Sequence, residues 1–364
     1  MHCEKNSLAH EPGRTLKTQM PMPQSVEQLL AANYLSVEKA YLDEVMVPGV
    51  AMLQRTRKPV EKYYRIGARV MAVAFYAPSL AERMTRACSH REIERPAHVD
   101  LWVHAWDSAS TQVEPVMPWT QHAYYREGRQ HADASTCMGV FTPGEDTITM
   151  YDRETRTACF WIRDGAHLPP WIVAAPFRTL FHWFLGEHGI QLVHGALVGS
   201  GDRALLFTAK GGSGKSSTAL ACARVGMTYL GDDYVGIEER QDGVRAHSLY
   251  QSLKVAPPGH EQREKQVVFA DTFAPGQIRQ DARLVAVCIP SIRHASATRM
   301  IPVHKAQALL ALAPTTLLQL PRANAQQFNV LKRVIERMPC YTLELSEDPH
   351  EIASVVRAFL EQHV

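Results

Sequence analysis

Hydrophobic and polar positions follow one another most regularly between residues 191 and 230. Alternating and continuous apolar segments there predict strands, and a segment rich in small residues predicts a helix that Gly226 ends with a left-handed cap. The expected elements are a strand at 191–198, a hairpin turn at 199–202, a buried strand at 204–207, a helix at 217–225 and a short strand at 228–230. This order predicts an α/β fold, in which neighbouring strand ends converge on a ligand crevice as they do in a doubly wound sheet.

Helical spacing of apolar residues predicts four more helices around this segment. One begins near Pro176 with an apolar face of Leu180, Phe181, Phe184 and Leu185, and a short one covers residues 306–312. A third, at 327–338, is expected to bury Phe328, Leu331, Ile335 and Met338. The last has Asp348 as N-cap and Pro349 in its first turn, followed by Ile352, Val355, Val356 and Phe359.

The first half of the chain has a different pattern. Ser25 and Gln28 form a capping box that predicts a helix, and residues 65–162 read as short strands and turns, such as 99–106 and 147–151. Several aromatic residues there could line a binding face, although packing in a core explains them better: Trp102, Trp106, Trp119, Tyr124 and Tyr125. We expect a flexible N-terminus at 1–22, an α+β accessory or substrate-recognition domain at 23–170 and a second domain at 171–364.

Composition and charge exclude several classes of protein. Apolar residues make up 46% and charged residues 21%, which is typical of a globular protein rather than a disordered or fibrous one. Lys and Arg number 39 against 37 for Asp and Glu, so a net charge of +2 favours neither nucleic acid nor an anionic membrane as a partner. The polar first residues show no secretory signal and no apolar run is long enough to cross a bilayer, so we expect a cytoplasmic protein.

The spacing of the cysteines and histidines argues against disulfide bonds and zinc sites. The seven cysteines include no CxxC pair, and the seventeen histidines include no HxxxH or HExxH pair. Disulfide frameworks and zinc sites need closely spaced ligands, so reduced thiols and no metal site made by protein ligands alone are expected.

Residues 209–216, AKGGSGKS, fit a phosphate-binding loop in which alanine replaces the usual leading glycine. Glycines at 211, 212 and 214 would allow positive φ angles, so that backbone amides face phosphate oxygens at the start of a helix. Lys215 would reach the β- and γ-phosphates and Ser216 could ligate Mg²⁺. The alternative is a Gly/Ser surface turn. The expected nucleotide-binding residues are Lys210, Gly211, Gly212, Ser213, Gly214, Lys215, Ser216 and Ser217.

Two further features accompany the loop. Asp232 and Asp233 end the short strand at 228–230, where one carboxylate could hold Mg²⁺ and the other could accept a proton from an attacking hydroxyl. His194 lies on the strand that enters the hairpin. Their structural alternatives are a solvated Asp-Asp turn and a core histidine.

Together these motifs resemble the HPr kinase/phosphorylase family, whose core is related to phosphoenolpyruvate carboxykinase. The resemblance covers roughly residues 176–240 and rests on four segments: Val193-His194-Gly195, residues 212–216, Thr218-Ala219-Leu220 and Asp232-Asp233. It implies a P-loop core of this type, with ATP as donor and Mg²⁺ as cofactor. By the same resemblance Lys215 binds phosphates, Ser216 and Asp233 bind Mg²⁺, Asp232 is the base and His194 lies beside the transferring group; the two aspartates could exchange roles.

The chain also departs from that family. Ser217 replaces a glutamate, a downstream glycine-rich segment has no counterpart, and residues 1–170 do not resemble the regulatory domain. The chain is therefore more similar to divergent HPr-kinase-like proteins of peptide-tailoring or polysaccharide clusters, one branch of which phosphorylates a serine of a lasso-peptide precursor. HPr kinases form hexamers, so the resemblance also suggests a homo-oligomer.

The expected function is ATP-dependent, Mg²⁺-assisted phosphoryl transfer to a serine hydroxyl of a small protein or peptide. The alternatives are a small-molecule kinase of the same fold and a non-catalytic nucleotide-binding module. Four basic residues are weaker candidates for a phosphate contact, for which a solvated surface charge is the simpler interpretation: Lys254, Arg283, Arg293 and Arg299.

Overall fold

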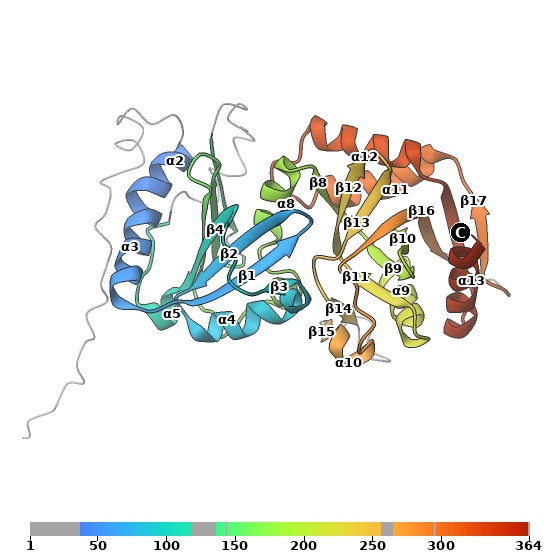
Figure 1. The fold of residues 1–364 in the computed structure, drawn as a ribbon, viewed down its shortest axis with the longest axis horizontal. Helices are drawn as coiled ribbons and strands as arrows, with labels where there is room; N and C mark the ends of the chain where they lie inside the picture. Colours follow the sequence, from blue (N-terminus) through green and yellow to red (C-terminus); the bar gives the residue numbers. More distant parts are fainter. Residues whose placement is uncertain (1–36, 118–135, 143, 256–264, 294–295, 363–364) are drawn as a thin grey trace, which may run out of the picture.

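The computed structural model describes residues 37–117, 136–142, 144–255, 265–293 and 296–362. It is a mixed α/β structure in which two large sheets lie side by side, each with helices packed against it (Figure 1). The first sheet uses residues 60–162 and the second residues 190–345. The helix predicted at Ser25 and three of the aromatic residues (Trp119, Tyr124 and Tyr125) lie outside the described residues.

The first sheet has seven strands in the order β3-β1-β2-β4-β7-β6-β5. Their bounds are β1 Val60–Ile66, β2 Arg69–Phe75, β3 Glu92–Ile93, β4 Leu101–Asp107, β5 Cys137–Thr142, β6 Thr147–Asp152 and β7 Thr157–Ile162. The predicted strands at 99–106 and 147–151 are thus confirmed with small shifts at their ends, as β4 and β6. Trp106 on β4 is fully buried, which confirms core packing for that aromatic residue.

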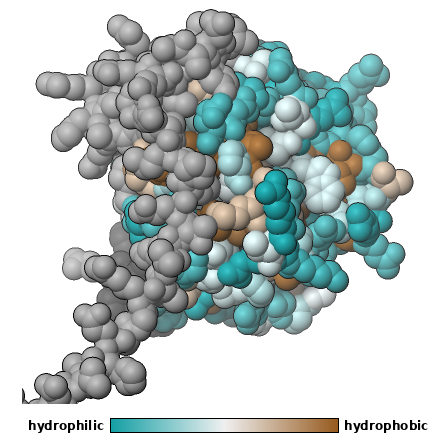
Figure 2. Space-filling view, turned by 90° about the vertical axis from the view of Figure 1, so that its left-hand side faces the viewer, coloured by the Kyte–Doolittle hydropathy of each residue, from teal (hydrophilic) through white to brown (hydrophobic). Residues whose placement is uncertain are grey.

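Short helical segments surround this sheet. They are α2 Val37–Tyr41, the π-helical η1 Leu42–Met46, α3 Val47–Thr56, α4 Pro78–Thr85, the 3₁₀ segment η2 Arg86–Arg91, and α5 Ser108–Thr111. Residues 41–53 pack with Trp106 and Trp161 on one face of the sheet. Figure 2 shows the side of the molecule that carries α2 and α3, where hydrophilic residues alternate with hydrophobic ones.

One hydrophobic cluster contains residues of both sheets. Two helices connect them, α7 Pro170–Ala174 and α8 Arg178–Glu187, and the four apolar residues predicted for α8 are all buried. The cluster that contains Phe181 includes Phe75 and Phe160 of the first sheet as well as Leu192 and Tyr250 of the second part. The proposed division of the chain at residue 170 therefore falls beside a continuous core, and it stays a prediction.

The second sheet has nine strands and is mixed rather than doubly wound and parallel. Its main order is β11-β9-β10-β16-β13-β12-β8, with β18 beside β16 and β17 beside β18, and only β10–β16 and β16–β18 are parallel pairs. The bounds are β8 Ile190–His194, β9 Ala196–Ser200, β10 Arg203–Phe207, β11 Thr228–Gly231, β12 Tyr234–Arg240, β13 Gly243–His247, β16 Asp281–Ile292, β17 Arg299–Pro302 and β18 Cys340–Leu345. A separate hairpin pairs β14 Ser252–Val255 with β15 Gln266–Phe269.

The single strand predicted at 191–198 is wrong: the chain breaks at Gly195 into β8 and β9. β8 pairs with β12, whereas β9 pairs with β10 and β11. A Cβ at Gly195 would lie 2.7 Å from the carbonyl oxygen of Phe207, so the backbone approaches β10 too closely for a side chain. Its N–H donates to the carbonyl of Asp233 (3.1 Å), which ties this break to the turn after β11.

Helices cover both faces of the second sheet (Figure 1). They are α9 Lys215–Arg224, α10 Ala270–Phe273, α11 Lys305–Leu317, α12 Ala325–Arg337 and α13 Pro349–Gln362. α9 and α13 share one core cluster, and α11 and α12 share another.

The backbone N–H of His350 donates to Asp348, and Gly226 has φ of 89°, so both predicted caps are confirmed. Phe328 is an exception, since it is 39% exposed rather than buried. Among the described helices, none is both long and apolar enough to cross a membrane.

A buried polar cluster also joins the two parts. Arg91 of η2 is 1% exposed, its Nε donates to the carbonyl of Ser248 (2.7 Å), and its Nη2 lies 3.1 Å from Asp281. His247 contacts Asp281 through Nδ1 and lies 2.9 Å from Glu238 through Nε2. A guanidinium contributed by the first part thus neutralises a carboxylate of the second.

Substituting Arg91 with methionine is expected to lower the free energy of unfolding by about 2–4 kcal/mol, because it removes the guanidinium from the Ser248 carbonyl and leaves Asp281 with His247 as its partner. The matched control is Arg69→Met, which removes a surface pair with Asp100 in which the arginine is 40% exposed, and should cost less than about 1 kcal/mol. Urea unfolding measures both variants. Equal effects would show that the cluster contributes no more than a surface ion pair.

Candidate functional site

The topology of the second sheet brings several chain segments to one edge. β10 and β11 are both antiparallel to β9 and therefore run in the same direction, so the loop after β10 and the turn after β11 lie at the same edge. Ala196 at the start of β9 pairs with Phe207 at the end of β10, which places the preceding His194 there as well. β16 and β18 run parallel to β10 and end at this edge too.

The loop after β10 has the backbone conformation that its glycines permit. Gly212 and Gly214 have φ of 78° and 96°, as predicted, whereas Gly211 does not adopt a positive φ. The φ angle of Gly214 favours glycine, and a Cβ there would also lie 2.6 Å from Cδ1 of Leu345 and displace the end of that side chain. Helix α9 begins directly after Gly214, two residues earlier than predicted.

Lys215 is a buried charged residue of this loop, with 6% of its surface exposed. Its Nζ donates to the carbonyls of Ala209 (2.7 Å) and Lys210 (3.1 Å), so the side chain folds back along the loop. Burial lowers the pKa of Lys215, and the charges of Asp232 and Asp233 oppose that shift. An anion bound at the start of α9 would meet this ammonium group and the positive end of the helix dipole.

The other expected nucleotide-binding residues form the rim of the loop. Lys210, Gly211, Gly212 and Ser217 are exposed, and Ser213 and Gly214 are half-buried. The hydroxyl of Ser213 is buried and has no hydrogen-bond partner within the described part of the chain. A buried hydroxyl without a partner is costly, so a ligand oxygen at this position would satisfy it.

Asp232 follows β11 and is 2% exposed. Its Oδ2 accepts a hydrogen bond from the Ser216 hydroxyl at 2.8 Å, while its Oδ1 is buried and has no partner among the residues described. Burial, together with the neighbouring charge of Asp233, raises the pKa of Asp232. This carboxylate would be stabilised by a cation at its unpaired oxygen.

Asp233 has the left-handed backbone conformation, with φ of 70°. Its Oδ1 lies 3.5 Å from Nε2 of His194 and its Oδ2 lies 2.5 Å from Nζ of Lys254. Burial alone would raise the pKa of Asp233, but His194 and Lys254 lower it well below its usual range. The left-handed turn lets both aspartates face one site, because two successive residues on a regular strand would point to opposite faces.

His194 ends β8 and is held by its surroundings. Its backbone N–H donates to Oγ1 of Thr316 (3.0 Å) and its ring lies 5.6 Å from the ring of Tyr234. Nε2 faces Asp233, and Nδ1 is buried without a partner in the described chain. His194 is therefore not a fully satisfied core residue, because its Nδ1 has no partner there. Its Nε2 links the end of β8 to Asp233.

The structure thus brings together Lys215, Ser216, Asp232, Asp233 and His194, but it pairs them differently from the expected roles. Ser216 contacts Asp232 and not Asp233, and His194 contacts Asp233 and not Asp232. The carboxylate of Asp233 faces His194 and Lys254, and the expected magnesium ligands, Ser216 and Asp233, stay a prediction.

Among the described residues, Lys254 is the one weaker basic candidate that contacts this group, through Asp233. Arg283 lies near the opposite end of β16, paired in register with Arg203 at the start of β10. Arg293 is 68% exposed and lies 4.0 Å from Glu344, and Arg299 is exposed on β17. Thr316 and Tyr234, which hold His194, were not found from the sequence because neither belongs to a motif.

The oxygens at Ser216 and Asp232 fit a magnesium ion. Mg²⁺ prefers hard oxygen ligands and is usually held by one or two protein groups together with substrate phosphates. The unpaired Oδ1 of Asp232 and the adjacent Ser216 hydroxyl meet this requirement. Within the described ranges no group of three or more His, Cys, Asp or Glu residues could hold a metal, so the remaining ligands would come from the substrate and water.

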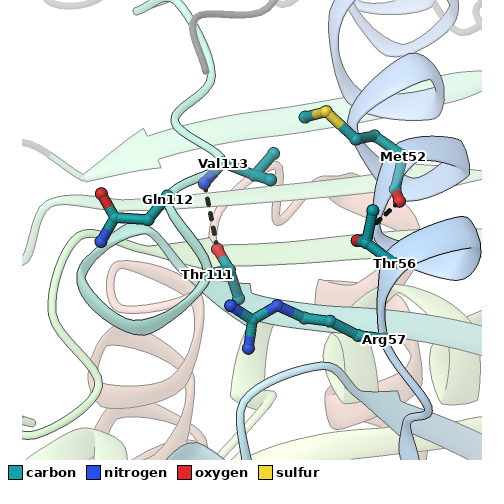
Figure 3. Close-up of a pocket in the computed structure, with 6 residues that line it drawn as sticks. All are labelled: Met52, Thr56, Arg57, Thr111, Gln112 and Val113. Atoms are coloured by element: carbon teal, nitrogen blue, oxygen red, sulfur yellow. Dashed lines mark hydrogen bonds between the residues drawn. The ribbon is translucent and has the colours of Figure 1, made fainter. Parts of the chain in front are cut away.

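A separate cavity of about 340 Å³ opens on the first sheet between the end of α3 and the segment after β4 (Figure 3). It is lined by Met52, Thr56, Arg57, Thr111, Gln112 and Val113. Its one charged side chain, Arg57, donates to the carbonyl of Ser110 (2.8 Å). None of the residues predicted to act in catalysis or binding lines this cavity.

No protein-family model matches the chain, and no curated protein is similar to it at a significant level. Among solved structures, one match is the Hpr(Ser) kinase/phosphatase from Coxiella burnetii, with 11% sequence identity and a TM-score of 0.30. The match covers 47% of this chain and 97% of that one. A TM-score this low carries no inference about fold or activity, so the function rests on the contacts at the site.

Proposed function

We propose that this protein is an ATP-dependent, Mg²⁺-assisted kinase that transfers a phosphoryl group to a serine hydroxyl of a small protein or peptide. The observation that carries the proposal is the convergence of three groups at one sheet edge. They are the glycine loop with Lys215, the Ser216–Asp232 pair and the Asp233–His194 pair. Binding of a magnesium-bound nucleotide would use the first two groups, whereas phosphoryl transfer also uses a base, which the third group supplies.

Binding of the donor would use the loop and Lys215. Phosphate oxygens would replace the carbonyls of Ala209 and Lys210 as partners of the Lys215 ammonium, and the start of α9 would face the same negative charge. The Ser213 hydroxyl offers one more donor there. These groups fix the position of the phosphates.

Ser216 and Asp232 would hold Mg²⁺. When bound, the ion neutralises charge on the β- and γ-phosphates during transfer. This assignment exchanges the two aspartates relative to the first expectation, because only Asp232 contacts Ser216.

Asp233 would then be the base. The acceptor hydroxyl forms a bond to the γ-phosphorus, its proton passes to a carboxylate oxygen of Asp233, and the bond between that phosphorus and the bridging oxygen of ADP breaks. His194, through Nε2, would orient the carboxylate. The choice of a serine on a protein or peptide as acceptor rests on the motif resemblance of residues 176–240.

The test is transfer of label from γ-labelled ATP in the presence of Mg²⁺ and a cell extract, divided by ultrafiltration into a macromolecular and a small-molecule fraction. We expect label in phosphoserine of the macromolecular fraction, absent when Asp233→Asn replaces the wild type. Label in the small-molecule fraction would indicate a metabolite kinase instead. ATP binding without transfer in either fraction would indicate a binding module.

Asp232→Asn is expected to remove the magnesium dependence of ATP binding, because the unpaired carboxylate oxygen is the proposed ligand. Titration with ATP in Mg²⁺ and again in EDTA measures this effect. Wild type should bind about tenfold more tightly with Mg²⁺, which is the gain expected from one charged contact, and Asp232→Asn should show less than about a twofold difference. An unchanged magnesium effect would exclude Asp232 as the ligand.

A further inference from the structure

Lys254 forms an ion pair with Asp233, the carboxylate that the proposed reaction uses as its base. It lies on β14, with its side chain 23% exposed, and its Nζ is 2.5 Å from Oδ2 of Asp233. In the structure Asp233 is therefore held on both sides, by Lys254 at Oδ2 and by His194 at Oδ1. Both oxygens therefore already have a partner, and an acceptor hydroxyl would share the carboxylate with Lys254 or His194 unless one of these groups moves.

His194 is the less mobile of the two. It belongs to β8, its backbone is bonded to Thr316, and its ring packs beside Tyr234. Lys254 carries its charge on a flexible four-carbon stem. Of the two neighbours, Lys254 is the one whose charged group can be displaced without moving a strand.

The backbone under Lys254 is fixed. The neighbouring Ser252 hydroxyl donates to the carbonyl of Ala174, and its own carbonyl accepts from the Tyr229 hydroxyl (2.7 Å). Leu253, between Ser252 and Lys254, is 1% exposed. The side chain of Lys254 can therefore change partner while β14 stays in place.

The charge of a bound donor provides the new partner. In the proposed reaction the terminal phosphoryl group must lie next to Asp233, because the same acceptor oxygen bonds to phosphorus and gives its proton to that carboxylate. An ammonium group at 2.5 Å from Asp233 is then beside phosphoryl oxygens that carry more negative charge than one carboxylate.

We propose that Lys254 is a second phosphate-binding cation, which leaves Asp233 for the terminal phosphoryl group when the donor binds and thereby frees the base for the acceptor. The inference rests on the proposed function and adds a residue that contacts the transferring group. It also gives the empty site a stable resting state, in which the buried carboxylate of Asp233 is neutralised.

The experiment compares ATP with ADP, since only ATP carries the terminal group. Lys254→Met is expected to weaken ATP binding about tenfold, as for one charged contact, and ADP binding less than about twofold. Lys254→Arg should restore most of the preference for ATP. The matched control is Lys265→Met, because Lys265 follows on the same hairpin and its charge acts on Lys215. This control variant should change the affinities for ATP and ADP by the same factor.

A double-variant cycle tests the exchange of partners. Asp233→Asn removes the group that competes for Lys254, so ATP affinity should rise, and the rise should be smaller when Lys254 is already methionine. An equal loss of affinity for ATP and ADP in Lys254→Met, or no loss of affinity, would overturn the inference while leaving the proposed kinase function intact. A wild-type protein that binds neither nucleotide would overturn both, and thermal unfolding of each variant confirms that it is folded.

Discussion

Lys215→Met is expected to abolish measurable ATP binding, with a loss of affinity of about a hundredfold or more. Lys215 is the buried cation of the loop, and its Nζ lies within hydrogen-bond distance of the carbonyls of Ala209 and Lys210, which phosphate oxygens would replace. Methionine fills a similar volume but donates no hydrogen bond and carries no charge. Transfer of phosphate should therefore be lost together with binding.

The matched control for this variant is Lys210→Met. Lys210 lies in the same loop and carries the same charge, but its side chain is exposed, so its loss should change ATP affinity by less than about threefold. Calorimetric titration with ATP in Mg²⁺ measures both variants, and thermal unfolding checks that they remain folded. If Lys215→Met bound ATP as tightly as Lys210→Met, the loop would not be a phosphate site.

The segment around the loop could be predicted from sequence because its signals are local. The hairpin after β9, the start of α9 and the cap at Gly226 each depend on residues that are close together in the chain. The positive φ angles at Gly212 and Gly214 follow from the same local pattern. Asp348 capping the last helix belongs to this group as well.

The pairing of strands could not be predicted in this way. Gly195 appears within an apolar run, and only its close approach to the carbonyl of Phe207, a residue of another strand, shows why the chain must turn there. The mixed sheet order likewise depends on contacts between distant segments, such as β16 with β18. The role of the first sheet stays a prediction, since the residues that line its cavity include none of the site residues.

The different contacts of the two aspartates follow from the backbone conformation of Asp233. Asp232 and Asp233 are equivalent in the sequence, and either could have faced Ser216. The left-handed conformation of Asp233 directs its carboxylate to His194 and Lys254 and leaves Asp232 beside Ser216. Lys254 was only a weak candidate for the same reason, because nothing local indicates that β14 passes next to this turn.

Asp233→Asn is expected to lower the rate of phosphoryl transfer by about 10²–10⁴, which is the usual contribution of a positioned general base, while ATP binding is retained or improved. The amide keeps the shape of the side chain and can still contact His194, but it cannot accept the acceptor proton. Single-turnover transfer at saturating ATP separates this effect from binding.

The comparison with Asp232→Asn decides between the two assignments. If Asp233 is the base and Asp232 the metal ligand, Asp233→Asn changes the rate at saturating ATP and Asp232→Asn changes the response to Mg²⁺. The opposite pattern would restore the assignment in which Asp232 is the base. The two residues are neighbours with the same charge, so a general electrostatic effect would change the transfer rate and the magnesium dependence equally in both variants. Only distinct roles would change the rate in one variant and the magnesium dependence in the other.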